Sequence, residues 1–250
     1  AFDYDPKSKI GVIGYENGSM DVITPNEIKY IVDIPIAAGY NGNKKINHIS
    51  ITGDQAVISV GYGVSIFNIK KKEFGDSSFF LTAGVYEASN EATIFGNKVY
   101  SVTNTGLKSH ELNTTFPVFS TWTTEIPGAF RHIDSESELV FSSATAAFIY
   151  NNGTPMQLPT SFGNINDVVV NSNSIVVTDS RVYTFGINGT YSNAIDFGEK
   201  CNTSIIANGK IFGGTTFSGI KDEGNTTYKP SGPNFNFAHK INLYDNNQLL

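Results

Sequence analysis

The sequence predicts an all-β fold, a β-propeller of six four-stranded blades plus a partial seventh. A short apolar strand behind a tight polar turn recurs every 36 to 46 residues, and repeats of this length are typical of propeller blades. The chain's 24 glycines suit such turns, and β-branched residues fill the strands between them. The recurring strands open at Ile10, Ala56, Val99, Leu139, Ile175, Ile211 and Leu249.

Each expected blade is built from the same signals. In the first, Pro6 marks a turn and Asn17-Gly18 marks a hairpin between strands. The clearest example is residues 46–69, where two turns separate three apolar strands. No segment shows helical periodicity over three turns. The chain is expected to be one propeller domain, 1–250, with blades at 2–38, 46–82, 91–127, 130–160, 165–198, 201–232 and, in part, 238–250.

The later blades repeat these signals with small variations. In the third, residues 118–126 are predicted to form the outer strand, which holds Trp122. Turns with Asn residues connect strands in the next three blades, and the seventh repeat starts near residue 239. One residue in the middle of each complete second strand is expected to face a neighbouring blade, because alternation decides which face is buried. These residues are Val12, Ile58, Tyr100, Phe141, Val177 and Phe212.

Such sheets must stack, because a small antiparallel sheet cannot bury both faces alone. Closing a ring normally requires one terminus to complete the blade of the other. Residue 2 already opens its own blade, and the seventh repeat lacks at least two strands. The chain is therefore expected to be a fragment of a larger ring, with the remainder of the parent chain packed against the open edge.

Composition excludes several classes of partner. A net charge of −6 provides no basic face for nucleic acid, and no apolar run is long enough to span a bilayer. Lys70, Lys71 and Lys72 fall between strands and are interpreted as a solvated turn. Cys201 is the only cysteine, so an intrachain disulfide and a cysteine-based metal site are both excluded.

No constellation for catalysis, cofactor binding or metal binding is evident. His48, His110, His132 and His239 lie in four different repeats without the spacing of a metal site. Phosphate-binding, dinucleotide-binding and nucleophile-elbow motifs are absent. We therefore expect no enzyme, no cofactor and no metal. A propeller enzyme acting on glycans remains an alternative, and Asp134 and Asp167 are its nearest candidate carboxylates.

Two segments resemble a known family. The first carries YDPKSKIGVIGYENGSMDVI and NKKINHISITGDQAVISVGYGVSIFNIKKKEF within residues 2–75, and the second carries KPSGPNFN within 229–244. Both are similar to the N-terminal β-propeller module of PorZ-type proteins, components of the type IX secretion system of Bacteroidetes. The likeness is loose over 114–228. It departs from the family pattern at His48 and at Val57-Ile58, where the family has Asp and Tyr-Leu.

The resemblance implies an exported protein at the periplasm or cell surface. It implies a non-catalytic scaffold that binds other proteins, possible partners being components of the secretion system. The sensor propellers of Bacteroidetes two-component regulators have similar blades, so a periplasmic ligand-sensing propeller is the alternative reading. The resemblance brings no catalytic residues with it.

Overall fold

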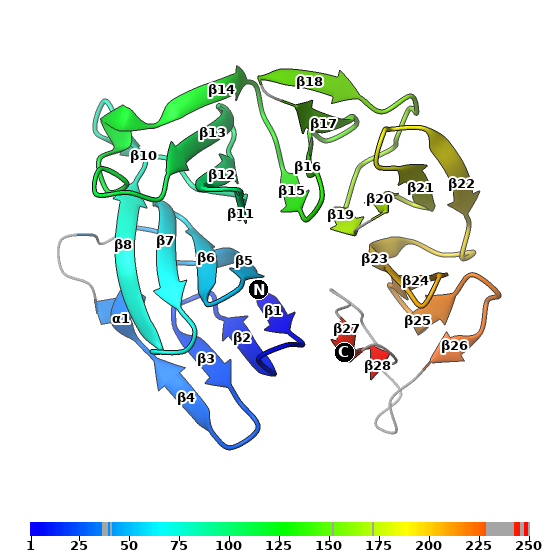
Figure 1. The fold of residues 1–250 in the computed structure, drawn as a ribbon, viewed down its shortest axis with the longest axis horizontal. Coiled ribbons are helices and arrows are strands. Elements are labelled where there is room, and N and C mark those ends of the chain that lie inside the picture. The colour runs from blue at the N-terminus through cyan, green and yellow to red at the C-terminus, as the bar shows by residue number, and fades with distance from the viewer. Residues whose placement is uncertain are drawn as a thin grey trace. The chain divides into compact units, whose positions relative to one another are not determined.

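The computed structural model describes residues 1–36, 40, 42–151, 153–171, 173–228, 243–245 and 248–249. Its fold is all-β, a β-propeller of six antiparallel blades with four strands each, as the sequence predicts (Figure 1). Helix within the described residues is limited to α1 (Asp33–Ile36) and one 3-10 turn, η1 (Phe119–Thr121). None of the described helices has the length and hydrophobicity that a bilayer span requires.

The chain divides into two compact units, Ala1–Arg131 and His132–Leu250, which we call unit 1 and unit 2. In every blade the strands pair in chain order, so each sheet is a simple meander. Unit 1 holds three blades. Blade 1 is β1 (Phe2–Asp5), β2 (Ile10–Gly14), β3 (Met20–Ile23) and β4 (Ile28–Ile31); blade 2 is β5 (Ile46–Thr52), β6 (Gln55–Val60), β7 (Gly63–Asn68) and β8 (Glu73–Phe79); blade 3 is β11 (Glu91–Phe95), β12 (Lys98–Val102), β13 (Gly106–Glu111) and β14 (Thr123–Pro127).

Unit 2 holds the other three blades. Blade 4 is β15 (His132–Ser135), β16 (Leu139–Ser142), β17 (Ala147–Asn151) and β18 (Thr154–Gln157); blade 5 is β19 (Asp167–Asn171), β20 (Ser174–Thr178), β21 (Val182–Gly186) and β22 (Tyr191–Ile195); blade 6 is β23 (Cys201–Ala207), β24 (Lys210–Thr215), β25 (Gly219–Asp222) and β26 (Thr227–Tyr228). Most of the expected seventh repeat lies outside the described residues. Within it, β27 (Leu243–Asp245) and β28 (Gln248–Leu249) form a two-stranded antiparallel sheet.

Three elements differ from the prediction. Residues 118–126 were expected to form one outer strand, but η1 occupies the first part and β14 starts only at Thr123. The one-turn helix α1 follows the last strand of blade 1, inside the span 2–38 that was expected to form that four-stranded blade. A small hairpin, β9 (Leu81–Thr82) and β10 (Val85–Tyr86), lies between blades 2 and 3. All three are too short to produce a periodic signal in the sequence.

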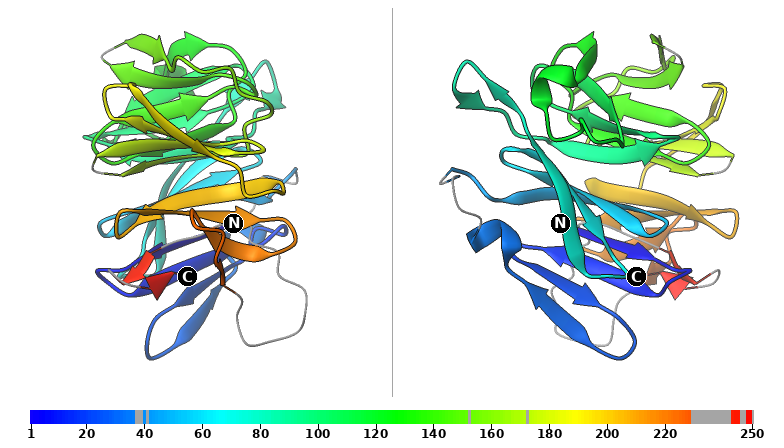
Figure 2. Two further views of the ribbon diagram at one scale, coloured as in Figure 1. Left: turned by 90° about the vertical axis from the view of Figure 1, so that its right-hand side faces the viewer. Right: turned by 60° about the vertical axis from the view of Figure 1, so that its left-hand side comes forward.

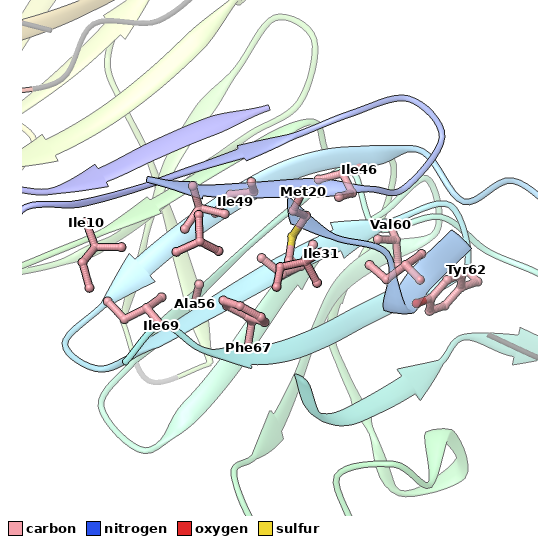
Figure 3. Packing of buried hydrophobic residues seen from close by; sticks show 14 of the residues in the cluster. Ile10, Met20, Ile31, Ile46, Ile49, Ala56, Val60, Tyr62, Phe67 and Ile69 are labelled. Atoms are coloured by element: carbon pink, nitrogen blue, oxygen red, sulfur yellow. The ribbon is translucent and has the colours of Figure 1, made fainter. Parts of the chain in front are cut away.

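Apolar side chains fill the space between blades 1 and 2 (Figure 3). Phe67 of β7 is fully buried there and meets Phe74 edge-on at 5.0 Å between ring centroids. Met20 of β3 and Ile49 of β5 reach the same cluster from the two blades. Burying apolar side chains from both sheets is the main force that stacks the blades. Similar clusters join blades 2 and 3, blades 4 and 5, and blades 5 and 6.

The residues expected to pack between blades are mostly buried. Val12, Ile58, Tyr100, Phe141 and Val177 are buried, whereas Phe212 is only half-buried. They do not all face in the same direction. Val12 and Ile58 lie in one cluster and therefore face each other, while Val57 faces blade 3. The counterpart of Val12 in blade 2 is thus Val57, one position earlier, because a one-residue shift reverses the buried face of a strand.

Candidate binding surface

Of the four histidines, His110 has the contacts of a structural residue. His110 is buried beside Trp122, and its ring nitrogens lie 2.6 Å from the Glu111 carbonyl and 2.7 Å from the Thr121 hydroxyl. His239 lies outside the described residues. Across the described ranges, no three His, Cys, Asp or Glu side chains are arranged so that they could hold a metal ion.

The two carboxylates considered for glycan chemistry connect neighbouring blades. Asp134 Oδ2 accepts the backbone N–H of Val170 at 2.8 Å, and Asp167 Oδ2 accepts the hydroxyl of Thr203 at 2.5 Å. Each bond runs from the first strand of one blade to the first strand of the next. In unit 1, Asp3 makes the same kind of bond to the N–H of Ile51 at 2.7 Å. These three carboxylates therefore hold first strands together.

A second set of contacts between blades comes from asparagines that sequence reasoning missed. Asn47 Nδ2 donates to the Ser89 carbonyl at 2.8 Å, Asn90 to that of Phe130 at 2.7 Å, and Asn166 to that of Cys201 at 2.8 Å. Each asparagine lies at the start of a first strand and reaches the start of the next blade. The signal is visible in the sequence, because an asparagine occupies this place in blades 2, 3 and 5. We call these three side chains the asparagine latches.

Cys201 has the surroundings of a structural residue. Its thiol is fully buried and lies 3.3 Å from the Thr203 carbonyl. Burial is the main cause that raises the pKa of this thiol, to about 12. A thiolate is the nucleophilic form of cysteine, so this side chain is inert at neutral pH.

Several loops pack together at one end of blades 1 and 2. We call this region the loop end of unit 1: residues 15–19, 33–36, 40, 42–45, 61–62 and 79–87. Gly18 adopts φ +86°, and a Cβ at that position would lie 2.7 Å from the Lys44 carbonyl oxygen and 2.8 Å from Cγ2 of Ile34. Only glycine allows the turn and the linker to approach this closely. The loop end is therefore a continuous surface within unit 1.

Aromatic rings give the loop end its packing. Tyr62 stacks on Phe79 at 4.6 Å between centroids, and Tyr40 meets Tyr62 edge-on at 5.0 Å. Tyr86 of β10 contacts Tyr40 at 4.6 Å and so ties the β9–β10 hairpin to this cluster. Burial is the main cause that raises the pKa of Tyr62 above its ordinary value. Aromatic pairs of this kind stabilise contacts beyond their buried area.

The hairpin itself exposes apolar side chains. It extends beyond the sheet of blade 2 (Figure 2), and its turn has φ +51° at Ala83 and +81° at Gly84, as a type I′ turn requires. Val85 at its tip is 70% exposed. We call four exposed apolar residues the hairpin patch: Leu81, Val85 and Tyr86 of the hairpin, and Phe79, the last residue of the preceding strand β8. Clustered apolar surface of this kind commonly marks a contact with another macromolecule.

Blade 1 carries a concave feature that extends from the loop end onto β3 and β4. It is an open hollow of about 510 Å³ lined by Tyr15, Glu16, Asn17, Ser19, Asp21 and Tyr30. The Tyr15 hydroxyl donates to Asp21 Oδ2 at 2.6 Å, and this hydrogen bond is the main cause that raises the pKa of Tyr15. Among the described residues, no lysine, arginine or histidine lines the hollow. We call it the tyrosine hollow.

Comparison with known proteins shows which propellers this chain resembles. Residues 1–123 match the family model described as the N-terminal β-propeller domain of PorZ, of the type IX secretion system. The resemblance to PorZ is confirmed. A solved structure of PorZ, described as an essential bacterial surface component of that system in Porphyromonas gingivalis, superposes with a TM-score of 0.74 at 14% identity. The match covers 94% of this chain and 33% of PorZ, so the chain spans about a third of the length of that protein.

Other propellers share the fold. The extracellular domain of BT4673 from B. thetaiotaomicron, a putative hybrid two-component system, superposes with a TM-score of 0.66 at 12% identity, covering 96% of this chain and 35% of that one. The WD40 propeller of Doa1 gives a TM-score of 0.66 at 10% identity, covering 88% and 76%. No curated protein matches the sequence. At these identities the structural likenesses show the fold alone.

Proposed function

We propose that this protein is a non-catalytic propeller scaffold that binds another protein of the type IX secretion apparatus at the periplasm or cell surface of a Bacteroidetes cell. The observation that carries the proposal is the match of residues 1–123 to the PorZ propeller model, together with the PorZ superposition over 94% of the chain. The family-model match covers blades 1 and 2 and the first three strands of blade 3, and this part of the chain includes the loop end of unit 1.

The chemistry of the described side chains supports a binding role. Asp134, Asp167 and Asp3 are engaged in contacts between blades, and Cys201 is buried with its pKa raised. The hairpin patch, by contrast, exposes apolar side chains, and three of its four residues lie on a two-stranded hairpin outside the sheets of the blades. Exposed apolar groups gain free energy when a protein partner covers them. We propose that a secretion-system component contacts the hairpin patch.

A second contact is proposed within the parent protein. Within the described residues, the seventh repeat contributes the two strands β27 and β28, whereas blades 1 to 6 have four strands each. An open sheet edge presents unpaired backbone groups that another strand can bond. The remainder of the parent chain is proposed to pack against this edge.

Deletion of the gene in its source organism tests the proposed function. Loss of type IX cargo from the cell surface and the medium, detected by immunoblotting, is the expected result. A plasmid with the wild-type gene should restore the cargo, whereas Leu81→Ser with Val85→Ser should restore little of it at equal protein level. Normal cargo secretion in the deletion strain would contradict a role in this apparatus.

A further inference from the structure

The tyrosine hollow lies on the face of blade 1 that points away from blade 2. Val22 of β3 and Ile31 of β4 are buried in the cluster shared with blade 2. Asp21 and Tyr30 alternate with them along the same strands and pair directly with each other across the sheet. Since successive residues of a strand point to opposite faces, Asp21 and Tyr30 share the other face. Tyr30 is 59% exposed there.

The hollow has the chemistry of a site for a cation. Two tyrosines supply aromatic rings, and Asp21 and Glu16 supply carboxylates. Asp21 accepts one hydrogen bond from Tyr15, and a carboxylate can accept several more. Lys45 pairs with Glu16 at 3.3 Å, but both side chains are well exposed, so this pair is weak. The negative charge of Asp21 is therefore available to a ligand.

We infer that the tyrosine hollow binds an arginine side chain of a protein partner. A guanidinium is planar, stacks on aromatic faces and donates paired hydrogen bonds to a carboxylate, so it uses both features of the hollow. A neutral sugar could also lie against a tyrosine ring and donate hydroxyl groups to the carboxylates, but it has no positive charge to balance their two negative charges. This inference rests on the proposed protein-binding function and names the chemistry of the partner at this site.

The test uses the purified chain and a small probe, acetyl-Gly-Arg-Gly-amide, followed by NMR. Stacking on a tyrosine ring shifts the δ-methylene protons of the arginine upfield, so this signal reports the contact itself. A single side chain should bind with a dissociation constant in the millimolar range, because its cation–π and ion-pair contacts are individually weak. The matched control is the same peptide with citrulline, which has the shape of arginine without its charge.

Variants locate the contact. Tyr30→Ala and Asp21→Asn should each weaken binding about fivefold, the size expected of one such contact near the surface. Ile28→Ala should leave it unchanged, because Ile28 is 68% exposed on the same face of β4, two residues from Tyr30 and outside the hollow. Circular dichroism should show that all three variants are folded, since the altered side chains lie outside the core.

Three results would overturn the inference: equal shifts with the citrulline peptide, binding that Tyr30→Ala leaves unchanged, or tighter binding of maltose than of the arginine peptide. The last would instead assign the hollow to a carbohydrate. These outcomes can be distinguished from a failure of the proposed function. If the peptide does not bind but the deletion strain loses its cargo, only the arginine site is refuted. If the peptide binds but the deletion strain secretes cargo normally, the role in secretion is refuted and the arginine site stands.

Discussion

The asparagine latches should contribute measurably to stability, and Asn166 gives the sharpest test. Its Nδ2 donates to two backbone carbonyls, that of Asp179 at 2.9 Å and that of Cys201 at 2.8 Å. Each hydrogen bond contributes about 1 kcal/mol to folding, so Asn166→Ala should lower the free energy of unfolding by about 2 kcal/mol. For a chain of this size that loss corresponds to a fall in Tm of roughly 6 °C.

Thermal unfolding followed by circular dichroism measures this loss. Asn173→Ala is the control, because Asn173 is an exposed turn residue of the same blade, and such substitutions change stability by less than about 0.5 kcal/mol. Asn166→Asp keeps the shape of the side chain but replaces the donor with an acceptor, so it should lower Tm at least as much. Equal Tm values for the alanine variants at 166 and 173 would refute the reasoning about the latches.

Three further predictions concern buried groups. Burial tends to raise the pKa of Glu199, but hydrogen bonds from neighbours that include Lys221 outweigh it and lower the pKa from 4.5 to about 2. A carboxylate whose pKa is lowered by folding stabilises the native state above its unfolded pKa, and this stabilisation is lost as the pH falls through its folded pKa. The free energy of unfolding should therefore fall more steeply between pH 4.5 and 2 in the wild type than in Glu199→Gln, and parallel curves would contradict this. Cys201 should react with a thiol reagent at pH 8 only after unfolding, since its pKa is about 12; rapid labelling of the native protein would show that it is accessible. Phe67→Ala should cost about 4 kcal/mol in urea unfolding because the ring is fully buried between two blades; a cost below about 1 kcal/mol would mean that the cluster collapses around the cavity.

The blades could be predicted because each repeats a strong local signal. The second strands start within one residue of the positions read from the sequence, for example Ile10 for β2 and Ser174 for β20. Turn residues fix these starts, since Gly53 and Gly96 adopt positive φ between first and second strands. The register was harder. Strands such as β6 are buried on both faces, so they lack the alternation that would separate Val57 from Ile58.

The candidate site was not predictable in the same way. Tyr15, Asp21 and Tyr30 lie on three different segments, and only the pairing of β3 with β4 brings Asp21 and Tyr30 together. Three of the four residues of the hairpin patch come from strands of two residues each, which produce no periodic signal. The family resemblance pointed to the first blades but named no binding residues. The sequence therefore indicated the propeller blades, whereas the candidate binding surface became visible only once the structure showed how the loops pack.

A photo-cross-linking amino acid at position 85, in the full protein in its own cells, tests the central claim most directly. Val85 is 70% exposed at the tip of the hairpin patch, so a partner covering the patch lies within reach of the cross-linker. The control position is Tyr191, an exposed residue on β22 of unit 2. We predict that position 85, and not position 191, captures a type IX secretion component identified by mass spectrometry. The same cross-links from both positions, or none from position 85, would contradict the scaffold account.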